Sequence, residues 1–105
     1  MNIQTLSQEF KEALYGIYGA NLYKLYLFGS YARGDFHEDS DVDFLVVLKD
    51  PKMRSFTEIS KMSPLLSQFL KKYHRVFSVV PARSHDFETL QTPLYQNVRM
   101  EGIEI

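Results

Sequence analysis

The seven residues from Val42 to Leu48 contain one charge, that of Asp43, in an otherwise apolar run. A short apolar segment of this kind, closed by the turn signal Lys49-Asp50-Pro51, predicts a strand packed within a sheet. A carboxylate placed among apolar side chains is costly to bury unless a partner compensates its charge. The position of Asp43 therefore needs an explanation beyond packing.

Helical and extended patterns alternate along the rest of the chain. Thr5 with Gln8 and Ser55 with Glu58 are spaced as capping boxes at the starts of two long helices, and Pro64 should bend or restart the second of them. The predicted helices cover residues 6–18, 30–34, 55–73, 84–90 and 93–101, and the predicted strands cover residues 23–29, 42–48 and 76–80. The apolar stripe expected on the helix over 55–73 consists of Phe56, Ile59, Met62, Leu66, Phe69, Leu70 and Tyr73.

The predicted elements indicate one small domain over residues 1–105, because no repeat or linker interrupts them. Gly102 should stop the last helix and leave residues 103–105 as a tail. The expected class is α/β or α+β, with a small mixed sheet flanked by helices.

Charge and composition exclude several functions. Twelve basic and thirteen acidic residues give a net charge of -1, which is a poor match to a protein that grips nucleic acid. The chain has no cysteine, so a metal would have to bind oxygen or imidazole ligands. No apolar run is long enough to span a bilayer and the N-terminus does not look like a leader, so we expect a cytoplasmic protein without membrane contact.

Asp41 and Asp43 are separated by one residue, and the two-residue period of a strand places their carboxylates on the same face. Mg²⁺ prefers oxygen ligands and usually binds through one or two carboxylates together with substrate phosphates. The pair is therefore a candidate site for Mg²⁺ and for catalysis.

Gly29 and Ser30 lie between the first predicted strand and a short helical turn. At such a position backbone N–H groups face an incoming phosphate, and glycine permits its close approach. Ser30 adds a hydroxyl donor, Arg33 could reach the same anion, and Ser40 could shape the turn that enters the next strand. A Gly-Ser pair alone, or an Asp-x-Asp pair alone, is usually structural; their occurrence at the ends of two successive strands favours a nucleotide site.

These residues resemble the signature of the minimal nucleotidyltransferases of the polymerase-beta superfamily. Gly29-Ser30, ten intervening residues and Asp41-Val42-Asp43 match that pattern, with Ala32-Arg33-Gly34 and Ser40 between them. The resemblance implies a nucleotidyltransferase fold and Mg²⁺-dependent transfer of a nucleotide from ATP or another triphosphate. It further implies an all-helical HEPN-type toxin as partner, with this chain as the antitoxin that adenylylates it.

One position departs from that pattern. Active members of the family generally carry a third carboxylate on a later strand, whereas here the most nearly corresponding residue is Ser78. A neutral hydroxyl is a weak ligand for Mg²⁺ and a poor base at neutral pH. The acidic residues that could take its place, if the fold brings one near, are Asp35, Glu38, Asp39, Asp86 and Glu88.

Two functions therefore stay open from the sequence. In the first, the chain is an enzyme whose acceptor is a hydroxyl group of another protein, because so small a chain has little room for a separate acceptor pocket. In the second, it is a catalytically weakened binding module that neutralises a partner by forming a complex, which Ser78 favours. A homodimer is compatible with both, and a stand-alone nucleic-acid polymerase is disfavoured by size and charge.

Overall fold

The computed structural model describes all residues from 1 to 105. The elements in chain order are α1 (Ile3–Tyr18), a 3-10 turn (Gly19–Asn21), β1 (Leu22–Phe28), α2 (Ser30–Arg33), β2 (Val42–Leu48), α3 (Ser55–Tyr73), β3 (Phe77–Arg83), α4 (Ser84–Thr89), α5 (Pro93–Glu101) and β4 (Ile103–Glu104). The alternation of helices and strands expected from the sequence is confirmed.

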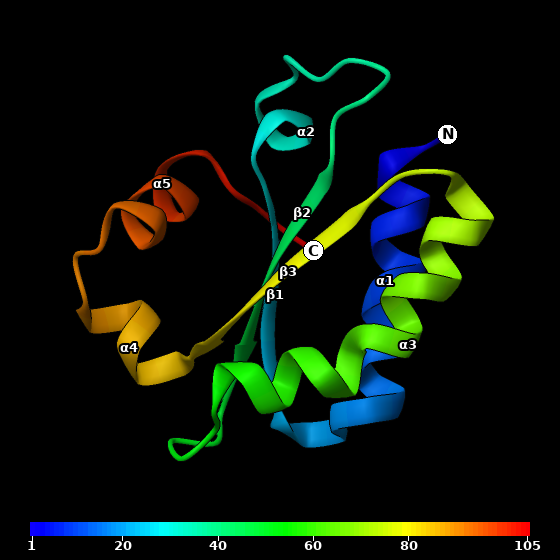
Figure 1. The fold of residues 1–105 in the computed structure, drawn as a ribbon. Coiled ribbons are helices and arrows are strands. Elements are labelled where there is room, and N and C mark those ends of the chain that lie inside the picture. Colours follow the sequence, from blue (N-terminus) through cyan, green and yellow to red (C-terminus); the bar gives the residue numbers. More distant parts are fainter.

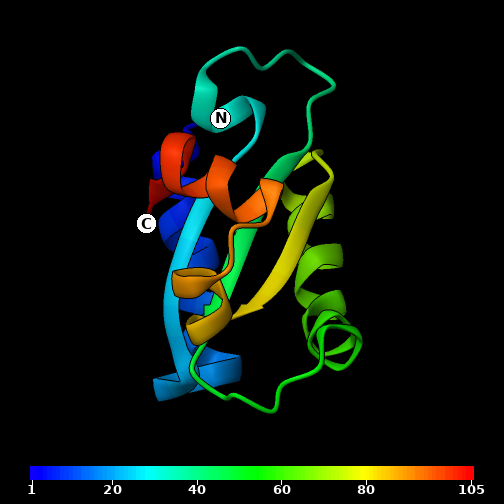
Figure 2. The same cartoon turned by 90° about the vertical axis from the view of Figure 1, so that its left-hand side faces the viewer.

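The four strands form one mixed sheet in the order β3-β2-β1-β4. β1 is antiparallel to both β2 and β4, whereas β2 and β3 are parallel. Helices α1 and α3 cover one face of the sheet and α4 and α5 cover the other, while α2 and the loop after it lie at one end (Figures 1 and 2). The expected small mixed sheet flanked by helices is confirmed.

Strand β2 runs through the middle of the molecule and is buried on both faces. Val42, Phe44, Val46 and Leu48 belong to the core beneath α1 and α3, and the residues between them, Leu45 and Val47, belong to a smaller core beneath α4 and α5. A strand covered by helices on both faces reads as a continuous apolar run. This burial explains why the sequence of β2 is apolar at every position except Asp43.

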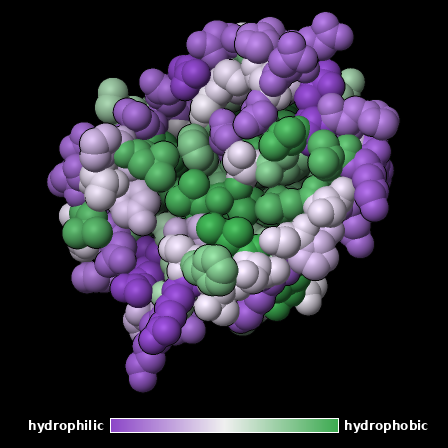
Figure 3. Space-filling model, viewed as in Figure 1, coloured by the Kyte–Doolittle hydropathy of each residue, from purple (hydrophilic) through white to green (hydrophobic).

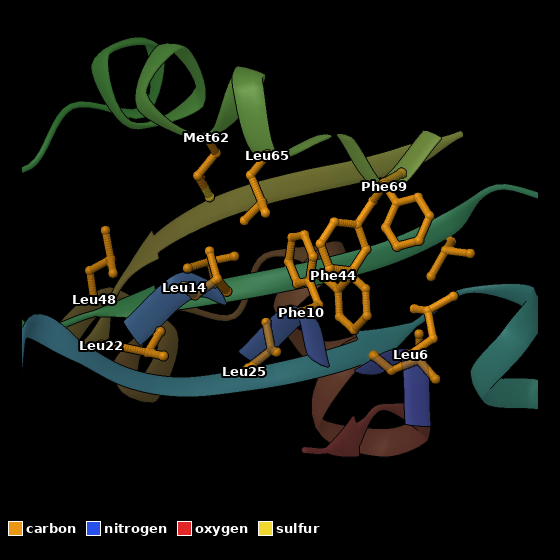
Figure 4. Packing of buried hydrophobic residues seen from close by; sticks show 14 of the residues in the cluster. Leu6, Phe10, Leu14, Leu22, Leu25, Phe44, Leu48, Met62, Leu65 and Phe69 are labelled. Carbon is orange, nitrogen blue, oxygen red and sulfur yellow. The ribbon is translucent and has the colours of Figure 1, made fainter. Parts of the chain in front are cut away.

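Aromatic rings fill the centre of the larger core (Figure 4). The Phe10 ring of α1 stacks on the Phe44 ring of β2 with a centroid separation of 4.6 Å, and it meets the Phe69 ring of α3 edge-on at 5.2 Å. Both arrangements are favourable for aromatic quadrupoles. Phe10 therefore fixes α1 against both the sheet and α3.

The first helix begins earlier than the capping box at Thr5 and Gln8 predicted. Asn2 is the N-cap, and its side chain accepts hydrogen bonds from the backbone N–H groups of Gln4 and Thr5 at 2.9 and 3.1 Å. Asparagine is among the best N-cap residues, so Asn2, three residues before Thr5, sets the start of α1.

Helix α3 has the predicted bounds, but two details of the prediction are wrong. The N-cap is Arg54 without a side-chain cap hydrogen bond, so Ser55 and Glu58 form no capping box. The helix continues through Pro64, and its axis bends along its length (Figure 1). The buried face is also rotated: Phe56 is 83% exposed, whereas Glu58 and Leu65 are buried. Four residues of the predicted stripe do contact the core: Met62 and Phe69 are buried in it, and Leu66 and Tyr73 pack against it.

Strand β3 is longer than predicted and continues through Pro81 to Arg83. Because β3 is an edge strand with β2 on one side only, a residue without an N–H group is tolerated there. Apolar residues gather over this edge and are bordered by hydrophilic ones (Figure 3).

The last residues do not form the free tail that the sequence suggested. Ile103 and Glu104 pair with Leu27 and Tyr26 as strand β4, and the Ile105 N–H donates to the Leu25 carbonyl at 2.8 Å. The open edge of β1 offers hydrogen-bonding groups to any extended segment that follows α5. None of the helices is both long and apolar enough to cross a membrane.

Candidate active site

The pairing of β1 with β2 brings the two sequence motifs together. Phe28, the last residue of β1, is the register partner of Asp43, so Gly29 lies directly beside that carboxylate. A Cβ atom added to Gly29 would lie 2.4 Å from the Asp43 Oδ2 atom, and the φ angle of Gly29 is +75°. Both the space and the backbone conformation therefore require glycine at this position.

Gly29 is followed immediately by α2, which begins at Ser30. The Gly29 carbonyl accepts from the N–H groups of Ala32 and Arg33, both at 3.1 Å, and Gly34 ends the helix in the left-handed conformation. The first N–H groups of a helix have no acceptor within it. The start of the turn therefore offers backbone donors where Gly29 approaches the Asp43 carboxylate, and Ser30 is the first residue of the helix.

Asp43 lies on the sheet face that carries α4 and α5, because Val42 and Phe44 on either side of it belong to the core on the opposite face. Val42 is fully buried in that core, and the Val42 N–H donates to the Val76 carbonyl at 2.9 Å. Asp41 is exposed and immediately precedes β2, whereas Asp43 is partly buried within it. The common orientation of the two carboxylates stays a prediction, because Asp41 lies just before the strand whose alternation would set it.

The electrostatics of Asp43 follow from this placement. Burial raises the pKa of the Asp43 carboxyl above its ordinary value, the negative charge of Asp41 raises it further, and the positive charge of Arg33 opposes both. Two carboxylates in this arrangement repel each other, so a cation placed between them is favoured.

The oxygen ligands available here fit Mg²⁺. No group of three acidic or histidine side chains that could hold a metal ion occurs in residues 1–105, so the chain supplies only the Asp41 and Asp43 pair. Mg²⁺ commonly completes its octahedral shell with water and substrate phosphates. The pair suits a cation that arrives with a triphosphate better than one held by protein alone.

Ser78 lies where the family pattern suggested. It is the register partner of Asp43 on β3, so the position beside Asp43 on the neighbouring strand carries a hydroxyl in place of a carboxylate. Asp86 cannot take that place, because it lies after the other end of β3, where it pairs with Arg83 at 3.8 Å. Asp35 pairs instead with Arg33.

Arg33 is held by two carboxylates. Its Nε atom donates to Asp35 Oδ2 at 3.2 Å, and its Nη1 atom lies 3.6 Å from Glu101 Oε2 at the end of α5. These partners raise the pKa of the guanidinium, Asp35 more than Glu101. The sequence did not point to Glu101, because only the packing of α5 over the sheet brings it to Arg33.

Ser40 has a contact within its own loop. Its Oγ atom accepts from the His37 N–H at 2.9 Å, and its N–H donates to the His37 carbonyl at 3.0 Å. These bonds close the turn that enters β2, as the sequence suggested, while a role for Ser40 in nucleotide binding stays a prediction.

A sequence model of the nucleotidyltransferase domain matches residues 3–91. The chain belongs to this family. A curated relative from Methanocaldococcus jannaschii, named "Putative protein adenylyltransferase MJ0141", is 33% identical over 105 residues, with all of both chains covered. A second protein of that organism, "Putative protein adenylyltransferase MJ0604", is 32% identical over 97% of this chain and 96% of its own length. This nucleotidyltransferase is thus similar to proteins named for an enzymatic activity.

Solved structures share the fold of this nucleotidyltransferase domain. A nucleotidyltransferase structure from Sulfolobus solfataricus superimposes with a TM-score of 0.65 at 22% identity and covers 95% of this chain and 76% of its own. The crystal structure of a toxin–antitoxin with AMP-PNP superimposes with a TM-score of 0.63 at 23% identity, and the match covers 91% of this chain and 69% of the other. The structure of a mutant of the toxin–antitoxin MntA-HpeT superimposes with a TM-score of 0.62 at 19% identity, and the match covers 99% of this chain and 71% of the other.

Proposed function

We propose that this nucleotidyltransferase moves AMP from ATP to a hydroxyl group of a partner protein. The observation that carries the proposal is the close approach of Gly29 to Asp43, which puts the start of a helical turn, where backbone N–H groups could bind a phosphate, beside the Asp43 carboxylate. The relatives named as protein adenylyltransferases support both AMP and a protein acceptor. The toxin–antitoxin neighbours support a toxin as the acceptor, which by family resemblance would be of the HEPN type.

In the proposed step the acceptor oxygen attacks the α-phosphorus of ATP. The new oxygen–phosphorus bond forms as the bond from that phosphorus to the bridging oxygen breaks, pyrophosphate leaves with the electron pair, and the hydroxyl proton passes to solvent. Gly29, Ser30 and Arg33 would hold the terminal phosphates. Mg²⁺ held by Asp41 and Asp43 would neutralise charge on the phosphate under attack. The chain contributes mainly alignment and electrostatic stabilisation.

The second candidate is a binding module that keeps the fold and neutralises its partner by covering it. The pairing of Ser78 with Asp43 favours this candidate, because it removes the carboxylate that would act as base or hold a second cation. The two candidates differ in whether the partner is modified.

The deciding experiment incubates the protein and the product of its neighbouring gene with Mg²⁺ and ATP labelled at the α-phosphate. A parallel reaction uses ATP labelled at the γ-phosphate, because adenylyl transfer retains only the α-label. We expect α-label on the partner with wild type, and none with the Asp41→Asn/Asp43→Asn double variant or with excess EDTA.

Glu88→Gln is the matched control, since it removes one exposed acid on α4, at the other end of β3 from Ser78 and Asp43. It should label like wild type. Absence of label from wild type, together with an intact complex in both wild type and the double variant, would favour the binding module. Retention of the γ-label would overturn both candidates in favour of phosphoryl transfer.

A further inference from the structure

Arg33 ends the helical turn that follows Gly29, and its two acidic partners lie far apart in the sequence. Asp35 follows it by two residues, whereas Glu101 belongs to the last helix. A guanidinium has five N–H donors, so contacts from Nε to Asp35 and from Nη1 to Glu101 leave donors free for an incoming anion. The two acids fix the orientation of Arg33 and leave it able to bind a phosphate.

The C-terminal segment is built in a way that fixes Glu101. Val98, one turn earlier, is buried in the core beneath α4 and α5, and the Gly102 N–H donates to its carbonyl at 2.8 Å. A Cβ atom added to Gly102 would lie 2.5 Å from that carbonyl oxygen. Ile103 then pairs with Leu27 of β1. The backbone of Glu101 is thus held between a buried helical turn and a strand, which keeps its carboxylate within reach of Arg33.

Glu101 is not part of the family signature. The match to the nucleotidyltransferase domain ends at residue 91, and α5 begins only at Pro93. The helix is nevertheless anchored on the domain, because Arg99 Nη2 donates to the Leu90 carbonyl at 2.9 Å and Arg99 Nη1 donates to the Phe87 carbonyl. Helix α5, which lies beyond the matched domain, therefore places the Glu101 carboxylate against Arg33 of the sequence motif.

We propose that Glu101 is a positioning residue that, together with Asp35, holds the guanidinium of Arg33 in place for the phosphates of ATP. The inference rests on the proposed function, because it assumes that Arg33 meets the triphosphate. Its physical basis is preorganisation: an arginine fixed before binding loses less side-chain freedom when the ligand arrives.

The test measures the affinity of the full chain for ATP in the presence of Mg²⁺ by titration calorimetry. Glu101→Gln and Glu101→Ala should weaken ATP binding by about three- to tenfold, the alanine variant more, because glutamine retains an acceptor oxygen. In label transfer the KM for ATP should rise by a similar factor while kcat changes little. Glu104→Gln is the matched control, since it removes a comparable exposed ion pair, with Lys24 at 3.7 Å, from the same segment.

A double-mutant cycle separates positioning from a general structural effect. In an Arg33→Ala background, Glu101→Gln should cause no further loss of ATP affinity, because the residue it orients is gone. Additive losses, or unchanged affinity in the single variant while wild type binds ATP, would overturn the role of Glu101. Failure of wild type itself to bind ATP would instead overturn the proposed function.

Discussion

Gly29 determines how closely the turn that begins α2 approaches Asp43. Because a Cβ atom there would collide with the Asp43 carboxylate, and because φ is +75°, Gly29→Ala must displace either the turn or the acid. We expect label transfer to fall by about a hundredfold, since a shift of about 1 Å can cost that much. The measurement is the initial rate of partner labelling, together with the thermal unfolding midpoint.

Gly16→Ala is the matched control for this substitution. Gly16 lies within α1, and a Cβ atom there would have no atom within 4 Å. This variant should keep full activity and gain about 0.5–1 kcal/mol in stability, because alanine is the better helix former. A Gly29→Ala protein that is as active as Gly16→Ala would contradict the proposed geometry.

Asp43 should lower the stability of the unliganded protein at neutral pH. Burial and Asp41 raise its pKa in the folded state above the unfolded value of about 3.9, so between the two values the folded chain binds more protons. Stability therefore falls as pH rises through this window and stays reduced above it. Asp43→Asn should unfold at a higher urea concentration than wild type at pH 7, and the difference should shrink as the pH falls through the window.

A variant that is no more stable than wild type at pH 7 would contradict this linkage. Addition of ATP with Mg²⁺ gives a second comparison, because ligand binding should stabilise wild type more than Asp43→Asn. The Asp43 carboxylate would then lower the stability of the unliganded protein and raise the stability of the protein bound to ATP and Mg²⁺.

Among the elements, α3 contains an exposed proline in its interior. Pro64 has no N–H group, so the Ser60 carbonyl lacks its usual donor, whereas the preceding turn gains a bond from Ser63 Oγ to the Ile59 carbonyl at 2.9 Å. Pro64→Ala should raise the free energy of unfolding by about 1–3 kcal/mol, as helix propensity predicts. Urea denaturation measures the change, and label transfer should be unaffected because α3 covers the sheet face opposite Asp43.

A loss of stability in Pro64→Ala would mean that the packing of Met62 and Leu65 depends on the shape that proline gives the helix. That dependence would also explain why a helix-breaking residue is accommodated in the middle of α3.

The sequence predicted the elements well where local signals agree with packing. Strand β2 has the predicted bounds because its apolar run is buried on both faces, and α5 begins at Pro93 because Thr92 accepts from the Tyr95 N–H. The prediction failed where tertiary contacts decide. Phe56 fits the helical stripe of α3 but lies outside the contact with the sheet, and the two residues of β4 are too few to give a pattern of their own.

For the whole molecule, the predictable part of the site is the part whose residues are close in sequence. Gly29 directly follows β1 and Asp43 lies in β2, the next strand, so a single antiparallel pairing suffices to bring them together. The contact between Arg33 and Glu101 depends on how α5 packs over the sheet, and neither residue type nor spacing signals it. The position of Ser78 was expected from the family pattern alone, and the parallel pairing of β3 with β2 confirms it.

The exposed loop over residues 35–40 joins the two halves of the site, and its main contact with the domain is the Phe36 ring, which stacks on the Tyr31 ring of α2 with a centroid separation of 4.4 Å. The ends of the loop are fixed by the pairing of Phe28 with Asp43, so a longer loop would leave Gly29 and Asp43 where they are. Loop closure grows costlier by only about 0.6 kcal/mol for each doubling of length. Evolution can therefore insert residues here and change what reaches the site, while the turn that begins α2 and the acidic pair are inherited unaltered.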